Sequence, residues 1–174
     1  MEQEGILILA TQRCAGTNIS KGIASYYNKK YVHEPNLFNI QWTTDDVVKL
    51  ISNEYSFPNY TSKFNNIILI TRRDLNSAKE SLGFLYNVKH GFDQPWNSSK
   101  IEIIKKSKLY KKASVRLDYC TRCINVLSKE LNIPIEYTED ILKDKKFTYS
   151  DIKIDPAYLE PNLKLRNTWN ETAI

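Results

Sequence analysis

The feature that most constrains the fold lies near the N-terminus, where an apolar run leads directly into a polar loop and then a helical pattern. Residues Gly5–Thr11 (GILILAT) are mostly aliphatic. This run is too short for a helix and is typical of a strand buried on both faces in a parallel sheet. After the loop, Ile19, Ile23 and either Tyr26 or Tyr27 recur at helical spacing. The order strand, loop, helix therefore predicts the start of an α/β fold.

The rest of the chain continues this alternation. Asn66–Thr71 (NIILIT) predicts a second buried strand, and a stripe from Leu75 to Leu85 predicts the helix after it. The other expected elements are a strand at Lys30–His33, a helix over Asp45–Asn53 capped by Thr43 or Thr44, a long loop over 87–99, a long helix over Tyr110–Leu131, a strand at Ile133–Tyr137 and an irregular tail from about Thr148 with a helical turn near Leu163–Trp169.

Alternating strands and helices predict a three-layer α/β/α arrangement with a mainly parallel sheet and right-handed crossovers. At 174 residues and 41% hydrophobic content, the chain has the size of one ordinary domain, and we expect a single domain over residues 1–174. Ligands of such sheets bind at the carboxyl ends of the strands. The loops that follow the strands are therefore where a site is expected.

The composition restricts the compartment and the partners. No stretch approaches the ~20 continuous apolar residues of a membrane helix, and the start MEQEGILILATQRC lacks the basic region of a secretory signal. We expect a cytoplasmic protein without a membrane or nucleic-acid partner. The net charge of +5 is concentrated between Lys100 and Glu130, which holds nine Lys or Arg against three Asp or Glu. A solvated helix face explains this segment better than a polyanion site.

The cysteines suggest neither a disulfide framework nor a metal site. There are three, Cys14, Cys120 and Cys123, and an odd number in a reducing compartment argues against disulfides. The Cys120-Thr-Arg-Cys123 pair falls in the middle of the expected long helix and has no second pair to complete a zinc site. We expect buried thiols and no bound metal.

The loop after the first strand has the composition of an anion-binding site. A helix N-terminus directs free N–H groups into the loop, and Gly16 permits close backbone approach. Arg13 adds a fixed positive charge, while Thr17 and Asn18 add polar contacts. A Walker A loop would have lysine at the position of Thr17 and glycine at that of Thr11. These two departures weaken a nucleotide-kinase interpretation.

In this segment the chain resembles the P-loop-like sulfotransferases, as a short member of bacterial or viral type. Their phosphosulfate loop typically reads Lys/Arg-Ser-Gly-Ser/Thr-Thr after a hydrophobic strand. Here an extra residue precedes Gly16, and Cys14 or Ala15 replaces the serine. The family holds the 3′-phosphate of its donor with an arginine at a strand end and a serine eight residues later. Arg73 and Ser81 have that spacing.

Two further points bear on this resemblance. Arg72 competes with Arg73 for the phosphate, because adjacent side chains of a strand point in opposite directions. Ile133–Leu142 (IPIEYTEDIL) is similar to the strand and Tyr-Glu-Asp-Leu segment found late in many members. The resemblance thus spans roughly residues 5–142.

The resemblance implies a P-loop NTPase-like sulfotransferase topology and transfer of a sulfuryl group from 3′-phosphoadenosine 5′-phosphosulfate to a hydroxyl acceptor. The product nucleotide would be adenosine 3′,5′-bisphosphate, and no metal is required. The expected donor-binding residues are Arg13, Cys14, Ala15, Gly16, Thr17, Asn18, Arg73 and Ser81.

Sulfuryl transfer needs a general base at the acceptor oxygen and a cation near the leaving phosphate oxygen. Arg13 suits the second role. Several bacterial-type members carry a glutamate in a Glu-x-x-Phe-like segment after the second strand, and Glu34-Pro-Asn-Leu-Phe38 is similar. Glu34 is therefore the preferred base and His33 its rival.

The sequence leaves the acceptor and the alternative functions open. Tyr86, His90, Phe92 and Trp96 either line an acceptor pocket or pack their loop onto the domain. A nucleotide or metabolite kinase and a non-catalytic nucleotide-binding module are the alternatives. Because sulfotransferase domains are commonly longer, a homo-oligomer whose partner subunit completes the acceptor site is also open.

Overall fold

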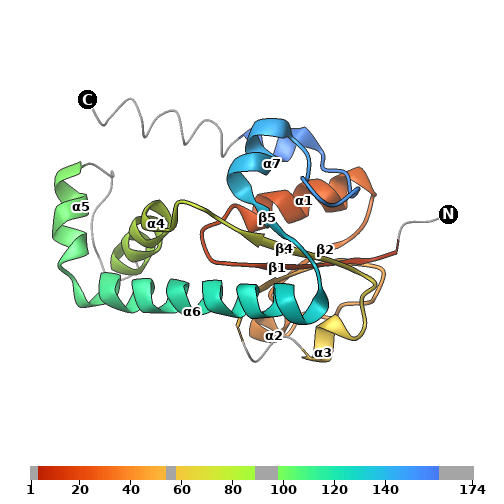
Figure 1. The fold of residues 1–174 in the computed structure, drawn as a ribbon, viewed down its shortest axis with the longest axis horizontal. Helices are drawn as coiled ribbons and strands as arrows, with labels where there is room; N and C mark the ends of the chain where they lie inside the picture. Colours follow the sequence, from red (N-terminus) through yellow and green to blue (C-terminus); the bar gives the residue numbers. More distant parts are fainter. Residues whose placement is uncertain (1–3, 54–57, 89–97, 161–174) are drawn as a thin grey trace.

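Five parallel strands form a single sheet in the order β2-β3-β1-β4-β5. The computed structural model describes residues 4–53, 58–88 and 98–160. The strands are β1 (Ile6–Ala10), β2 (Tyr31–His33), β3 (Val47–Ile51), β4 (Asn66–Thr71) and β5 (Ile135–Tyr137). Helices cover both faces (Figure 1). The expected α/β/α class with a parallel sheet is confirmed.

The two layers of helices pack on opposite faces of the central strand β1, all of whose residues are buried. Ile6 and Ile8 point to one face, and Leu7 and Leu9 point to the other. The first face carries α1 (Gly16–Tyr26), α7 (Thr138–Asp144) and the 3-10 turn η2 (Pro156–Tyr158). The second face carries α3 (Pro58–Thr61) and the C-terminal half of α6 (Lys108–Leu131).

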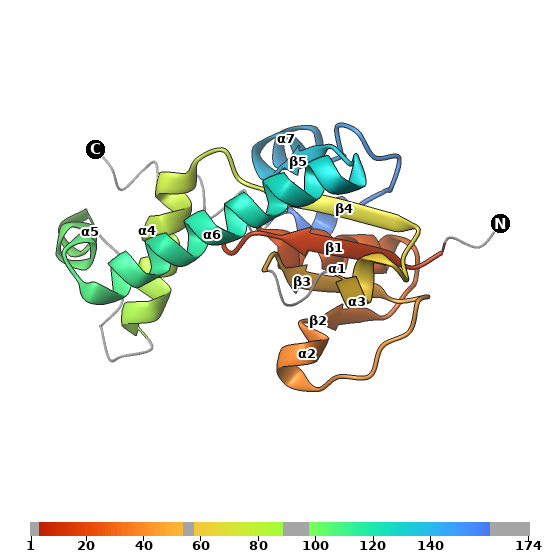
Figure 2. The same cartoon turned by 60° about the horizontal axis from the view of Figure 1, so that its bottom comes forward.

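The remaining helices lie near the carboxyl ends of the strands. The short α2 (Pro35–Phe38) follows β2 directly. The helices α4 (Leu75–Val88) and α5 (Ser98–Lys105) pack with the N-terminal half of α6 and extend beyond the sheet (Figures 1 and 2). The β1–α1 loop therefore opens at the edge of the sheet from which α4 and α6 project.

The prediction of a helix over Asp45–Asn53 is wrong. Residues Val47–Ile51 form β3, which pairs in parallel with β1 from Ile6↔Val47 to Ala10↔Ile51. The Thr43 hydroxyl does accept a hydrogen bond from the Asp45 backbone N–H at 3.3 Å, but this bond closes a turn. Valines favour the pleated, buried environment, and pairing on both sides of the strand outweighs the capping signal.

The long loop expected over 87–99 is only partly correct. The helix α4 continues to Val88, and α5 begins at Ser98. The expected long helix is confirmed, and it begins slightly earlier, at Lys108, because Ser107 Oγ accepts a hydrogen bond from the Tyr110 backbone N–H at 3.0 Å. The loop residues between α4 and α5, and the helical turn expected at 163–169, lie outside the described residues.

The segment after α7 is irregular, as expected, and it is anchored to the sheet. Residues 148–155 contain no helix or strand. The buried Glu136 of β5 accepts hydrogen bonds from the backbone N–H groups of Thr148, Tyr149 and Ser150 at 2.8 to 3.0 Å. Farther along, Ile154 is buried beside α1. The segment is thus part of the layer that packs on α1.

Candidate functional site

The β1–α1 loop has a backbone suited to surround an anion. Arg13 and Ala15 both adopt the left-handed conformation, with φ of 60° and 58°. Ala15 is the N-cap of α1 and provides no side-chain cap to the helix. The first-turn N–H groups of Gly16, Thr17 and Asn18 thus face the loop without a capping side chain. Such groups attract anions.

Gly16 is required by packing within the domain. A Cβ at this position would lie 2.8 Å from the Ala10 Cβ and 3.6 Å from the Lys49 Cε. The first distance is closer than real Cβ contacts, so a larger residue would push α1 away from β1. The glycine therefore keeps the start of the helix tight against the sheet, whereas the sequence suggested close approach to a ligand.

Arg13 and Ser81, two of the expected donor-binding residues, are in direct contact. Arg13 Nε donates a hydrogen bond to Ser81 Oγ at 2.8 Å. The pKa of Arg13 is lowered, because part of its side chain is removed from water and because the charge of Arg72 lies nearby. Two guanidinium groups and a hydroxyl therefore gather beside the loop. This is a cationic environment that an anionic ligand would neutralise.

Arg73, also expected at this site, is engaged elsewhere. Its Nη1 and Nη2 donate to Asp140 Oδ1 and Oδ2 at 2.7 and 2.6 Å. This hydrogen-bonded pair raises the pKa of Arg73 and lowers the pKa of Asp140. The guanidinium also lies 4.1 Å from the centre of the Tyr137 ring. Arg72 is less committed, since its Nε is 3.7 Å from Glu139 Oε1.

The expected base, Glu34, forms a buried ion pair with a lysine that the sequence interpretation missed. Lys49 Nζ donates to Glu34 Oε1 at 2.8 Å, and the two residues are 5% and 8% exposed. Lys49 was missed because its segment was assigned to a helix. A single lysine within the run Val47–Ile51 (VVKLI) was the available signal, because charged residues are almost never buried without a partner.

His33, the rival base, lies next to this pair. A hydrogen bond of 2.9 Å joins its Nδ1 to the Tyr31 hydroxyl. Partial burial and the positive charge of Lys49 lower the pKa of His33. Burial raises the pKa of Tyr31 to about 12, although its hydrogen bond with Thr17 acts in the opposite direction. His33 is therefore mostly neutral at pH 7 and able to accept a proton.

Cys14 holds the loop in place. Its buried Sγ donates to the Thr11 carbonyl at 2.8 Å, and its own carbonyl accepts from the Thr138 hydroxyl at 2.6 Å. Burial raises the pKa of Cys14. Because the thiol faces the core, only the Cys14 backbone is available to a ligand in the loop.

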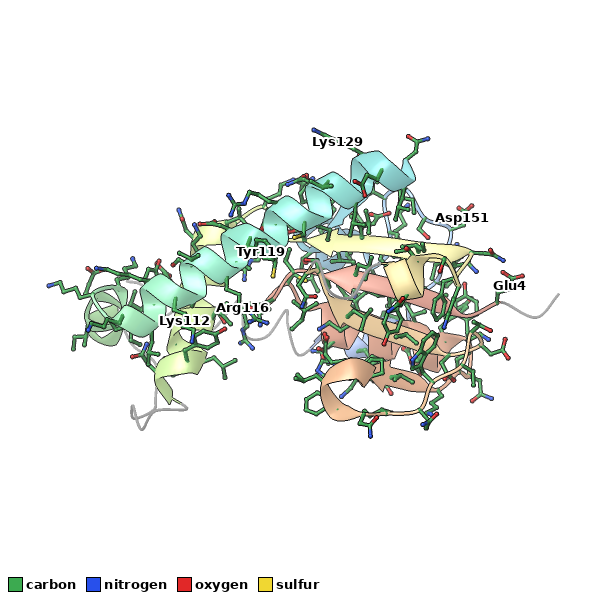
Figure 3. All side chains as sticks on the ribbon, turned by 90° about the horizontal axis from the view of Figure 1, so that it is seen from below. Glu4, Lys112, Arg116, Tyr119, Lys129 and Asp151 are labelled. Atoms are coloured by element: carbon green, nitrogen blue, oxygen red, sulfur yellow. The ribbon has the colours of Figure 1, made fainter. Side chains whose placement is uncertain are left out.

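Arg116, a residue of the basic segment, contacts the β1–α1 loop. Arg116 Nε on α6 donates to Gln12 Oε1 at 3.1 Å. Other cations of the helix, including Lys112 and Lys129, are exposed along its length (Figure 3). The solvated-face interpretation therefore holds for Lys112 and Lys129, while Arg116 adds positive charge beside the site.

The remaining candidates contribute packing or lie elsewhere. Cys120 and Cys123 are buried, as expected, and burial raises the pKa of Cys120 to about 11. Tyr86 packs against the small apolar cluster between α4 and α6. His90, Phe92 and Trp96 lie outside the described residues. Over residues 4–53, 58–88 and 98–160, no group of three His, Cys, Asp or Glu side chains is placed to hold a metal ion.

Two surface hollows in the described part of the chain can be placed relative to the loop. One lies between the C-terminal half of α1 and Tyr158, and another lies on the outer face of α6 around Arg122. The first is lined in part by Lys21 and by Tyr31, whose hydroxyl is hydrogen-bonded to His33, whereas the second is lined by residues of α6. The loop itself is recognised by its charges and its backbone.

Comparison with family models, with curated proteins and with solved structures finds no match. Within the described ranges, none of the helices has the length and apolar character needed to cross a membrane. Any statement of function therefore depends on the geometry of this chain and on the motif resemblance.

Proposed function

We propose that this chain is a sulfotransferase that moves a sulfuryl group from 3′-phosphoadenosine 5′-phosphosulfate to a hydroxyl acceptor. The observation that carries the proposal is the 2.8 Å hydrogen bond between Arg13 and Ser81. It connects the loop that resembles the phosphosulfate loop with the serine of the 3′-phosphate motif. Both motifs lie at the carboxyl ends of β1 and β4, which are adjacent and parallel, and ligands of α/β sheets bind at this edge.

The residues present fit the donor's charges. The loop N–H groups and Arg13 would hold the 5′-phosphosulfate. The 3′-phosphate would bind Arg73 and Ser81, which requires Arg73 to exchange Asp140 for the phosphate. Arg72 remains the alternative, because it already lies close to Arg13.

The chemistry assigns a role to each charged group. The donor supplies a sulfuryl group whose bond to the bridging phosphate oxygen breaks as the acceptor oxygen bonds to sulfur. The acceptor proton passes to Glu34, or to His33 in its place. Arg13 stabilises the negative charge that develops on the phosphate. No metal is needed for these steps.

A kinase is the second candidate, and Lys49 favours it. Its Cε lies 3.6 Å from the position that a Cβ on Gly16 would occupy, so a cation from β3 lies close to the loop that lacks a Walker A lysine. A kinase would bind ATP with Mg²⁺. The sulfotransferase proposal is preferred, because the Arg73 and Ser81 motif has no role in a kinase of this kind.

Calorimetric titration separates these functions. We expect tight binding of adenosine 3′,5′-bisphosphate without metal and weaker binding of ATP with Mg²⁺. A preference for ATP with Mg²⁺ would support the kinase and overturn the proposal. Binding of the bisphosphate without sulfate transfer to any hydroxyl compound in an acceptor panel would indicate a non-catalytic nucleotide-binding module.

A further inference from the structure

Lys49 occupies a position where an apolar residue would be expected. It lies in the buried strand β3 between Val48 and Leu50 and is 5% exposed. Removing an ammonium and a carboxylate from water is costly, and well-packed apolar residues often stabilise a protein as well as a buried ion pair or better. Stability alone therefore does not explain a lysine here.

The Lys49 side chain lies between the β1–α1 loop and the end of β2. It is in register with His33 on β2 and Ile8 on β1. Its Cε approaches Gly16 at the start of α1. Its charge lowers the pKa of His33 and opposes the rise in the pKa of Cys14 that burial causes. The ammonium is thus placed to act on both the loop and the candidate bases.

Glu34 is held against Lys49 by its backbone as well as its side chain. The Glu34 backbone N–H donates to the Lys49 carbonyl at 2.9 Å. Its φ and ψ of 44° and 57° are left-handed, a conformation that is unfavourable for a non-glycine residue. The fold maintains this strained backbone, and in it the carboxylate is turned to the lysine.

We propose that Lys49 exchanges Glu34 for the anion bound in the loop, so that donor binding frees the Glu34 carboxylate to accept the acceptor's proton. The inference rests on the proposed function for the identity of the anion. Lysine suits the exchange, because its ammonium is a point charge on a flexible stem. In the structure, Lys49 neutralises Glu34. With an anion in the loop, the ammonium turns to the anion and Glu34 loses its partner.

The exchange makes Glu34 a competitor of the anion, and this can be measured. We would titrate wild type, Lys49→Met, Glu34→Gln and the double variant with adenosine 3′,5′-bisphosphate, without metal. Lys49→Met should weaken binding about tenfold or more, through loss of a charge-assisted contact. Glu34→Gln should strengthen binding, because a neutral amide competes less for the ammonium. The double variant should bind like Lys49→Met.

A purely structural ion pair gives the opposite pattern. Glu34→Gln would then lower the melting temperature and leave the affinity unchanged or reduced, and that result overturns the exchange. Unchanged affinity in Lys49→Met also overturns it. Lys21→Met is the matched control, because Lys21 is an exposed lysine on α1 near His33, and it should bind like wild type. If Lys49→Met does not fold, it is replaced by Lys49→Arg, which keeps a cation at this position. If the exchange needs only a cation, Lys49→Arg should bind the bisphosphate at least as tightly as wild type.

The experiment also separates this inference from the proposed function. If wild type, Lys49→Met and Glu34→Gln all bind the bisphosphate with the same affinity, the sulfotransferase proposal stands and the exchange is wrong. If wild type does not bind the bisphosphate, the proposed function fails. Inorganic pyrophosphate is then titrated into the same four proteins. Tighter binding by Glu34→Gln supports the exchange, and any other order overturns it.

Discussion

Arg13 Nε donates a hydrogen bond of 2.8 Å to Ser81 Oγ, although 68 residues of chain separate them. The contact arises because β1 and β4 are parallel neighbours, so the loop after one strand meets the helix after the other. The result is one cationic edge that both segments build.

The first prediction concerns this pair. Arg13→Ala should weaken binding of adenosine 3′,5′-bisphosphate about tenfold or more, since a hydrogen bond to a charged group contributes about 1.5–3 kcal/mol. Ser81→Ala should have a smaller effect, because its hydroxyl is neutral. Calorimetry measures both affinities, and Lys129→Ala, at the far end of α6, serves as the control. Equal affinity in Arg13→Ala and wild type would contradict the assignment.

The second prediction decides between Arg72 and Arg73. Both terminal nitrogens of the Arg73 guanidinium donate to Asp140, so a phosphate must compete with that carboxylate. If Arg73 holds the 3′-phosphate, Asp140→Asn should strengthen bisphosphate binding and Arg73→Ala should weaken it strongly.

The matched measurement is Arg72→Ala under the same conditions. A large loss of affinity in Arg72→Ala, together with no gain in Asp140→Asn, would move the 3′-phosphate to Arg72. Adenosine 5′-monophosphate is a useful second ligand, because it lacks the 3′-phosphate and should be insensitive to Asp140→Asn.

The third prediction concerns the thiols. Alkylation requires the thiolate, burial raises the pKa of Cys120 to about 11, and it also raises the pKa of Cys14. Between pH 7 and pH 9 an ordinary thiol becomes largely ionised, whereas Cys14 and Cys120 ionise less than an ordinary thiol, and all three cysteines are buried. The folded protein should therefore react slowly with iodoacetamide over this range, and all three cysteines should react in denaturant. Rapid alkylation at pH 7, counted by mass spectrometry, would show a reactive thiol instead.

The sequence predicts the strands β1 and β4 well because each is a continuous apolar run, which only a buried strand explains at that length. It predicts β3 poorly, because Thr43 or Thr44 suggests a helix cap, and the residue with which Val47 pairs, Ile6, lies 41 residues away in the chain. The positions of Arg13 and Ser81 at one edge follow from the strand order. Their mutual contact, and the identity of Glu34 as the partner of the buried Lys49, depend on tertiary packing that no local pattern encodes.

The fourth prediction tests the loop backbone. Ala15 has a φ of 58°, so Ala15→Gly should relieve strain and stabilise the protein by about 1 kcal/mol. Gly16→Ala should destabilise it, because its Cβ would lie 2.8 Å from the Ala10 Cβ. Urea unfolding compares the two variants with wild type. A stable Gly16→Ala variant would mean that the loop shifts easily, which is inconsistent with a preformed anion site.

The last prediction concerns Glu136, whose two carboxylate oxygens accept three backbone N–H groups of the segment after α7. Oε1 accepts from Tyr149 and Ser150, while Oε2 accepts from Thr148. In Glu136→Gln one oxygen becomes an NH₂ group, which places two donors face to face and leaves a partly buried N–H without an acceptor. The variant should lose about 1–3 kcal/mol of unfolding free energy.

The loss of stability in Glu136→Gln should appear first in the segment after α7 and only then in the whole domain. Hydrogen exchange should rise first at Thr148, Tyr149 and Ser150, because their bonds to residue 136 hold the segment to the sheet. Thr121→Val, which removes a helix-internal hydroxyl bond on α6, should leave hydrogen exchange in this segment unchanged.

Because Ile154 packs beside α1, release of the segment also uncovers the helix that begins at the loop. Bisphosphate binding should then weaken in Glu136→Gln although the residue lies outside the donor site. Unchanged exchange at residues 148–150 would mean that the carboxylate does not anchor the segment.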